Sequence, residues 1–296
     1  MGELVSSLAQ SSAMKLAYMV ETPEAMGAMP WCWHGLPTRD VLERIAAIGY
    51  DGVELQVRDP SAFDGDAFLR ELKDCGLAVS ALSCGAARAA DKLYLIDQDP
   101  ARRRAAIARF KSILELAGRY GVNVGMGSFR GNLSWGPDPK TAFGWFRSAI
   151  EELIATAEKV NARILLEPTT RYVSDFLNTV GETIAFIDLV GSPRLEIEGD
   201  LHHMILEERS IPGALIKGHL SGKMTYLHLA DSNRLSPGWG CFNWMDIVDT
   251  LHAIGYTGWL TMEFRQEPDS DRAARRARAT LHSLLEEAPR SFLRKW

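Results

Sequence analysis

The chain has 296 residues, of which 46% are hydrophobic and 24% are charged, so it is long enough to bury one large core in a single domain. Its net charge of −5 offers no cationic field for a phosphate backbone, which argues against nucleic acid as a partner. No segment approaches the roughly 20 apolar residues of a membrane span, which argues against a membrane role. The cysteines contain no CxxC pair, and we interpret them as reduced thiols of a cytoplasmic protein: Cys32, Cys75, Cys84 and Cys241.

The sequence predicts alternating strands and helices. Residues 1–14 have neither a basic segment nor a sustained apolar run, and we interpret them as a loose leader before one domain at 15–296. Short apolar runs predict strands at 15–20, 52–57, 77–82, 122–128, 162–167, 194–200, 224–230 and 259–264. Helical periodicity predicts helices at 40–48, 65–75, 101–120, 141–160, 180–190, 207–218, 243–254 and 270–287.

This alternation predicts a parallel sheet, either closed into a barrel or left open and doubly wound. Eight predicted strands in one continuous run, with no GxGxxG after the first, favour a single (β/α)8 TIM barrel. The amphipathic segment at 270–287 would then be the C-terminal helix, packed on the outside of the barrel.

Ionisable residues lie at the ends of the last four predicted strands. Glu167, Asp200, His228 and Glu263 each follow or close an otherwise apolar run, and they are spaced by about one strand and helix unit. In such barrels the chemistry sits at the C-terminal ends of the strands, so these side chains should lie close together. Any one of them could be a strand-end polar group bonded to a nearby loop, but four in succession are hard to explain that way.

Three carboxylates and one imidazole form an oxygen-rich set suited to a hard divalent cation. We therefore predict one metal ion held by Glu167, Asp200, His228 and Glu263, with Mn²⁺ preferred, Mg²⁺ and Co²⁺ as further candidates, and Zn²⁺ less favoured. A bound cation would stabilise the enediolate that forms when a proton is removed beside a carbonyl. Strands five and eight are separated around the ring, so Glu167 and Glu263 could address opposite faces of a sugar and act as the catalytic acid and base.

The segments LEP, GDLHH, HLADSNR and MEF, in that order, resemble the xylose-isomerase-like barrel superfamily, and within it the branch of tagatose and psicose 3-epimerases and related sugar isomerases. The resemblance covers nearly the whole chain from about residue 15. It implies that Glu167 and Glu263 are both metal ligands and acid and base groups, and that Asp200 and His228 complete the site. It also implies that His203 and Arg234 hold substrate oxygens, although either could instead be structural, Arg234 for example by bridging carboxylates at the rim of the barrel. The family's second glutamate, six residues after the first ligand, is Val173 here, which argues against a simple free ketohexose.

Other residues near the predicted strand ends are candidate substrate contacts. Trp33 and Trp239 lie in loops that would share the barrel mouth and could form an apolar wall against a sugar, although packing would explain them equally well. His34 could reach the same space. Arg130 would lie at the end of the fourth strand, and Glu54 at the end of the second, either as a substrate contact or as a carboxylate that supports the metal site.

These observations favour a metal-dependent isomerase or epimerase of a keto-sugar or keto-sugar derivative, which would have a small-molecule partner and could form a homodimer or homotetramer. A lyase on the same scaffold, of the inosose dehydratase or keto-glycoside-cleaving kind, begins with the same proton abstraction and stays open. An endonuclease of abasic DNA is a remote alternative. In the relatives with that activity, histidines end the second and third strands, whereas the runs here end in VELQVRD and ALSCG. A non-catalytic sugar-binding barrel would have no need of two opposed glutamates.

Overall fold

A computed structural model gives the structure of residues 14–29, 33 and 36–293, with side chains described as far as residue 286. Eight parallel strands form a closed barrel in which each strand pairs with the next in sequence and β1 pairs with β8. The strands are β1 (Lys15–Glu21), β2 (Gly52–Gln56), β3 (Ala78–Ser83), β4 (Val124–Met126), β5 (Ile164–Leu166), β6 (Leu195–Asp200), β7 (Met224–Leu229) and β8 (Trp259–Met262). The predicted TIM barrel is confirmed.

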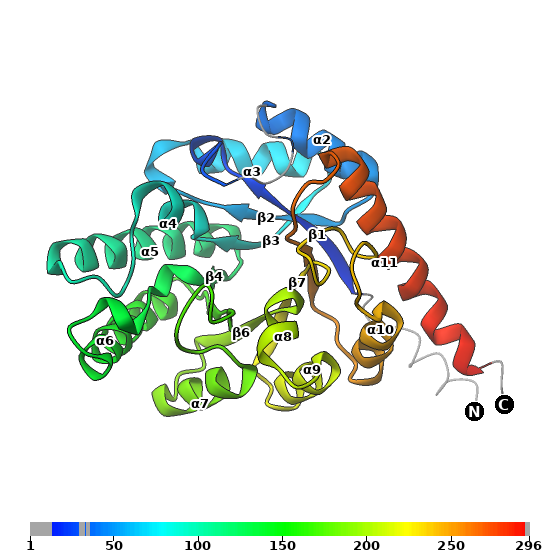
Figure 1. Cartoon of the computed structure of the whole chain (residues 1–296). Coiled ribbons are helices and arrows are strands. Elements are labelled where there is room, and N and C mark those ends of the chain that lie inside the picture. The colour runs from blue at the N-terminus through cyan, green and yellow to red at the C-terminus, as the bar shows by residue number, and fades with distance from the viewer. Residues whose placement is uncertain (1–13, 30–32, 34–35, 294–296) are drawn as a thin grey trace.

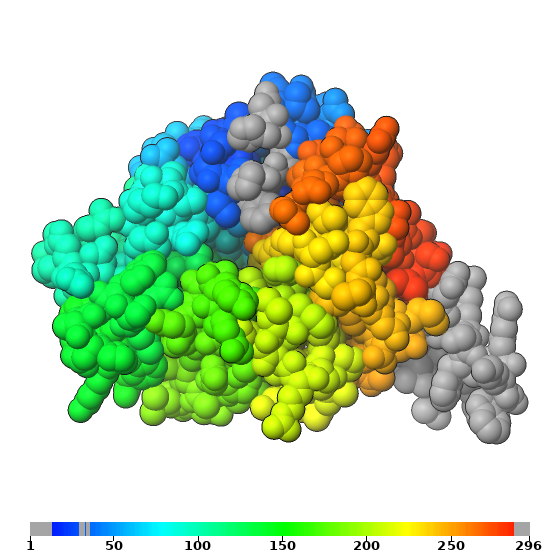
Figure 2. Space-filling model, viewed as in Figure 1, coloured from blue at the N-terminus to red at the C-terminus, as the bar shows by residue number. Residues whose placement is uncertain are grey.

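The helices surround the strands (Figure 1). They are α2 (Thr38–Ile48), α3 (Gly65–Asp74), α4 (Gly85–Asp91), α5 (Pro100–Tyr120), α6 (Pro139–Lys159), α7 (Val180–Val190), α8 (Leu201–Glu207), α9 (Ile211–Leu220), α10 (Trp244–Ala253) and α11 (Ser270–Leu293). The last helix packs against α10 and α2, so the two ends of the ring meet. The space-filling view shows the same order, with the colours following one another around the face from blue to orange and red (Figure 2).

Two helical segments differ from the sequence-based expectation. The helix expected at 207–218 is α9, which begins four residues later because Ser210 caps it and a proline stands in its first turn, and it is preceded by an additional helix, α8, which Asp200 caps. The short helix α4 was not predicted, since its alanine-rich sequence carries no amphipathic pattern. Gly49 and Gly121 adopt positive φ and end α2 and α5.

The main hydrophobic core lies between the strands and the helices, where residues such as Leu55, Phe110, Phe146 and Leu227 are fully buried. A separate small apolar cluster of Ala81, Leu165 and Tyr226, with Trp259 packed against it, belongs to the strands alone. Because most of the apolar packing lies outside the ring, polar side chains can line its interior. No helix within the described part of the chain is long and apolar enough to cross a membrane.

Candidate active site

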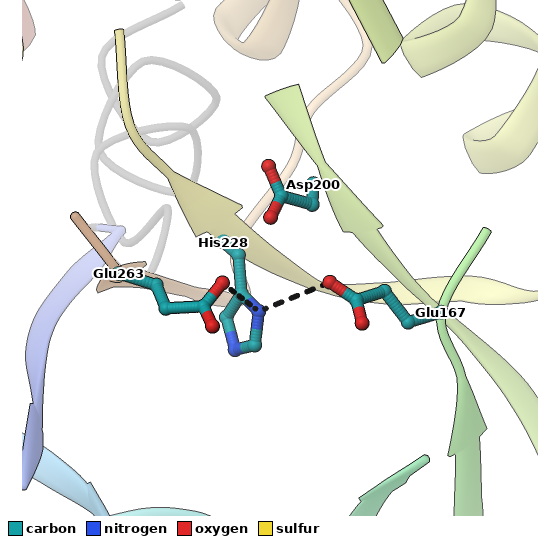
Figure 3. Close-up of side chains that lie close together, drawn as sticks. All are labelled: Glu167, Asp200, His228 and Glu263. Atoms are coloured by element: carbon teal, nitrogen blue, oxygen red, sulfur yellow. Dashed lines mark ion pairs between the residues drawn. The ribbon is translucent and has the colours of Figure 1, made fainter. Parts of the chain in front are cut away.

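Four ionisable side chains from the ends of successive strands converge on one point. Asp200 is the last residue of β6, His228 is the next-to-last of β7, and Glu167 and Glu263 directly follow β5 and β8. Each offers a ligand atom, and these atoms all lie within 4.8 Å of one another. Figure 3 shows the side chains pointing toward a shared space. The predicted convergence is therefore present.

The His228 ring presents its two nitrogens to two different sets of carboxylates. Its Nδ1 faces the shared space, 3.7 Å from Glu167 and 3.3 Å from Glu263 (Figure 3), and has no hydrogen-bond partner. Its Nε2 lies 2.7 Å from oxygens of both Glu54 and Glu198. These carboxylates outweigh the effect of burial, which opposes the charged ring, and raise the pKa of His228 well above its usual value.

The two oxygens of the Asp200 carboxylate also accept hydrogen bonds, one from the start of α8 and the other from Arg234. One carboxylate oxygen caps α8 by accepting from the backbone N–H groups of His202 and His203, and the other accepts from Arg234 Nη1 at 2.6 Å. Burial opposes ionisation, but the positive charges of Arg234 and His203 outweigh it and hold the pKa of Asp200 well below its ordinary value. The carboxylate is thus kept ionised although it is fully buried.

Arg234 bridges two of the four central residues, because its guanidinium also donates to Glu263. It adopts positive φ, an uncommon conformation for a residue other than glycine. The buried Asp231 holds the surrounding loop by accepting from the backbone N–H groups of Gly238 and Phe242 and from the indole of Trp244. The loop after β7 therefore directs the guanidinium inward.

Glu167 is held from the neighbouring strand unit. Its backbone N–H donates to Met126 of β4. A Cβ placed on Gly127 would lie only 2.1 Å from Glu167 Oε2, so the carboxylate occupies space that a side chain at this position would take. The absence of a side chain on Gly127 therefore lets Glu167 turn toward the centre.

Arg130 is fully buried and connects the segment that follows β4 with the loop that follows β5. Burial lowers the pKa of its guanidinium to about 10, so it still carries its charge near neutrality. Its Nη1 and Nη2 groups donate to oxygens of this protein, namely the carbonyls of Gly127, Glu167, Phe176 and Leu177 and the hydroxyl of Thr169. The structure thus corrects the expectation of a substrate contact, because these donors are engaged with the protein itself.

His203 lies on the first turn of α8, beside the central residues. Its Nε2 is 3.7 Å from both Glu167 and Asp200, and its Nδ1 has no hydrogen-bond partner. The imidazole therefore borders the space between the convergent residues, and its role as a substrate contact stays a prediction.

Glu54 is corrected in both position and contacts. It is the third residue of β2, not the strand's end, and it is fully buried. Its Oε2 accepts from Tyr226 at 2.9 Å and contacts the His228 ring. Of the two roles considered, support for the metal site agrees with this geometry, and a substrate contact does not.

The two tryptophans also have partners within the protein. Trp33 is buried, packs against Tyr18, and donates from its indole to Asp271 at the start of α11. Trp239 stacks on Arg276 of α11 at 5.0 Å. These contacts favour the packing alternative over an apolar wall for the sugar. His34 lies outside the described residues, as do Cys32 and residues 1–13 of the predicted leader.

Glu198 was missed from the sequence. It stands two residues before Asp200 in β6, and residues spaced by two in a strand share a face, so the EGD segment did contain a signal. Its burial raises the pKa of its carboxyl to about 8, even though His228 opposes this effect. A Cβ on Gly125 would lie 2.5 Å from its Oε2, so this glycine on β4 also leaves room for a carboxylate.

The charges of this cluster favour a cation. Its carboxyl groups outnumber its one guanidinium and two imidazoles together, namely Glu54, Glu167, Glu198, Asp200 and Glu263 against Arg234, His203 and His228. Buried carboxylates in such excess are costly unless they are neutralised. The unpartnered Nδ1 of His228 and the oxygen-rich donor set therefore fit a divalent metal ion.

Residues 42–284 match the family described as xylose isomerase-like TIM barrel. Because this match spans most of the sequence, the chain belongs to that family. The resemblance seen in the LEP, GDLHH, HLADSNR and MEF segments is thereby confirmed.

Individual relatives point to the same branch. The chain is 30% identical over 248 residues to L-ribulose 3-epimerase of Mesorhizobium japonicum, covering 80% of each protein. It is 26% identical over 245 residues to 3-dehydro-D-guloside 4-epimerase of Escherichia coli, covering 76% of this chain and 87% of the relative. A solved structure of L-ribulose 3-epimerase superposes with a TM-score of 0.77 at 22% identity, covering 96% of this chain and 98% of the other, which shows the shared fold.

Proposed function

We propose that this protein is a metal-dependent isomerase or epimerase of a keto-sugar or keto-sugar derivative. The observation that carries the proposal is the convergence of Glu167, Asp200, His228 and Glu263 on one point, with the two glutamates coming from separated strands. Relatives named as epimerases of a ketose and of a keto-glycoside support it. Val173, in place of the family's glutamate, favours a derivative over a free ketohexose.

The metal would be one divalent ion held by the same four residues. Mn²⁺ is the preferred candidate, followed by Mg²⁺ and Co²⁺, because carboxylate oxygens dominate the donor set; Zn²⁺ is less favoured. When bound, such an ion would act as a Lewis acid that makes the proton beside a carbonyl more acidic.

The protein's own part is to move that proton. One glutamate, as carboxylate, removes the proton from the carbon beside the carbonyl, and the other, as carboxylic acid, delivers a proton to the opposite face. The first glutamate ends the turnover protonated and the second ionised, so exchange with solvent restores the starting state. His203 and Arg234, which border the same space, would hold substrate oxygens and restrict the sugar to one orientation.

The test is proton exchange at carbon. The Mn²⁺-loaded protein is incubated in D₂O with a panel of ketoses and keto-glycosides, and deuterium uptake is followed by NMR. Glu167→Gln and Glu263→Gln should each reduce exchange by about 100- to 10,000-fold, because each removes an acid or base group. Glu151→Gln, an exposed change on α6 that affects only a surface ion pair with Arg147, is the matched control and should exchange like the wild type.

Two results would overturn the proposal. Retained exchange in both variants would remove the role of the glutamates. Formation of a new double bond or release of a substituent would assign the site to the lyase alternative.

Chelation tests the metal requirement separately. Prolonged treatment with excess EDTA should abolish deuterium uptake, and added Mn²⁺ should restore it, since the carboxylates alone cannot supply Lewis-acid chemistry. Metal content is measured by mass spectrometry on the same samples. Full activity in protein that contains no detectable metal would contradict this prediction.

We also propose a homo-oligomer in the cytoplasm. Exposed apolar side chains gather on helices α7 to α10, with Leu220 78% and Met245 65% exposed, and apolar patches of this kind often mark contact surfaces. The described cysteines are free thiols, as the cytoplasm maintains them. Analytical ultracentrifugation tests the assembly, and a monomer at micromolar concentration would refute it.

A further inference from the structure

A layer of buried polar groups lies inside the barrel, next to the four convergent side chains. Glu54 is fully buried and Glu198 is 2% exposed, and both approach the same nitrogen of His228 from different strands. The Tyr226 hydroxyl connects this layer, since it donates to Glu54 and contacts the hydroxyls of Ser80 and Thr261. None of these groups belongs to the four proposed ligands except His228.

The contacts of Nε2 decide which nitrogen keeps its hydrogen when the ring gives up the other one to bind a cation. Nε2 lies 2.7 Å from Glu54 Oε2 in hydrogen-bond geometry, and this carboxylate oxygen already accepts from the Tyr226 hydroxyl, so Nε2 is the donor. The nitrogen left to donate a lone pair is then Nδ1. That atom faces Glu167 and Glu263 and has no hydrogen-bond partner.

We propose that Glu54 and Glu198 are positioning residues that hold hydrogen on Nε2 of His228 and thereby present Nδ1 to a divalent cation. Carboxylates that accept from the distal nitrogen of a metal-binding histidine fix both its tautomer and its ring orientation. The inference rests on the proposed metal site. It concerns metal binding and the state of the ring, which can be measured without turnover.

The two carboxylates differ in how they approach the ring. Glu54 Oε2 meets the geometry of a hydrogen bond with Nε2 and is itself fixed by the Tyr226 hydroxyl. Glu198 Oε1 is equally close but has no hydrogen-bond partner, so it restricts the ring mainly by its proximity. Glu54 should therefore contribute more to the tautomer than Glu198.

The first experiment measures the affinity for Mn²⁺ by isothermal titration calorimetry, with no substrate present. Glu54→Gln should weaken binding by about 10- to 100-fold, Glu198→Gln by less, and the double variant by the most. Glu196→Gln is the matched control, because Glu196 lies on the same strand but pairs with Arg163 and Thr225. It should bind Mn²⁺ like the wild type.

The second experiment observes the ring directly, using protein labelled with ¹⁵N-histidine and loaded with diamagnetic Zn²⁺. Long-range ¹H–¹⁵N spectra should show hydrogen on Nε2 of His228 and a metal-bound Nδ1 in the wild type. The Nε2–H signal should exchange faster with solvent in Glu54→Gln. If that variant does not fold, as judged by circular dichroism, Tyr226→Phe removes the hydroxyl that fixes Glu54 and should give a smaller change in the same direction.

The outcomes separate this inference from the proposed function. Unchanged Mn²⁺ affinity in both single variants and in the double variant, or hydrogen on Nδ1 with the metal on Nε2, would overturn the positioning role alone. A wild-type protein that binds no divalent cation would overturn the metal site together with the inference. If the positioning role fails, Glu167→Gln and Glu263→Gln should still lose deuterium exchange.

Discussion

The two halves of the barrel contribute to the site in different ways. Strands β5 to β8 end in the four residues that converge on the centre. Strands β1 to β4 supply support: Glu54 on β2 contacts the His228 ring, and Gly127 and Arg130 after β4 give Glu167 its space and hold its carbonyl. A polar residue near a strand end can thus serve the reaction directly or serve a neighbouring side chain.

Depth along the strand explains part of this difference. The convergent residues are at or just beyond the ends of their strands, whereas Glu54 lies two residues before the end of β2. Inward-facing residues at that depth contact side chains from the strands opposite, such as Tyr226 and His228. A glutamate at the end of a strand and a glutamate two residues before the end therefore have different roles.

The largest effect on activity is expected when a side chain fills the space beside Glu167 that Gly127 leaves open. Gly127→Ala should lower kcat/KM by about 100-fold, because the new methyl group displaces the Glu167 carboxylate from its working position. The cost in unfolding free energy should be only about 1 kcal/mol, since the end of a glutamate side chain can move aside. Steady-state kinetics and urea denaturation measure the two effects.

Gly144→Ala is the control for this substitution. A Cβ at Gly144, in α6, meets nothing within 4 Å, so stability should rise by about 0.5–1 kcal/mol and activity should not change. Equal activities of the two alanine variants would show that the space at Gly127 has no part in catalysis.

Removal of the buried guanidinium tests support through the backbone. Arg130→Met should lower the free energy of unfolding by about 3–5 kcal/mol, because it leaves buried carbonyls without their donors. Urea denaturation measures the loss. Arg147→Met, which breaks only an exposed ion pair on α6, should stay within about 0.5 kcal/mol of the wild type. Similar losses in both variants would argue against the role given to Arg130.

The smallest effect is expected for Trp239, which follows β7 in the second half of the barrel but lies outside the site. Trp239→Ala should cost about 0.5–1 kcal/mol of stability, the contribution of its stacking on Arg276. Its KM and kcat should match those of the wild type, since the indole packs against α11. A large increase in KM would restore Trp239 as a substrate contact.

Much of the fold could be predicted because the evidence was local. Each predicted apolar run overlaps an observed strand, since strands buried on both faces must be almost wholly apolar. Helix α8 was missed and the start of α9 was placed four residues too early, although Ser210 and Pro212 form a helix start. In the site, the central residues stood out as ionisable groups that end apolar runs.

The partners of individual side chains needed the structure. Arg130 looked like an anion-binding residue, but the strand five loop folds over it and its carbonyls take up the donors. Glu198 was not predicted as a site residue, although it approaches the same histidine as Glu54. Such contacts join residues that are distant along the chain, so the spacing of Glu198 from Asp200 could indicate the face it shares but not its partner.

The sequence by itself determined the order of the strands, favoured their closure into a barrel through their number, and identified the four convergent residues, because apolar periodicity and charges at strand ends are local features. Only the tertiary structure decided which polar residues face the centre and which support them. That distinction depends on strand register and on the contacts across the ring, where a shift of two residues moves a carboxylate from the mouth of the barrel to its interior.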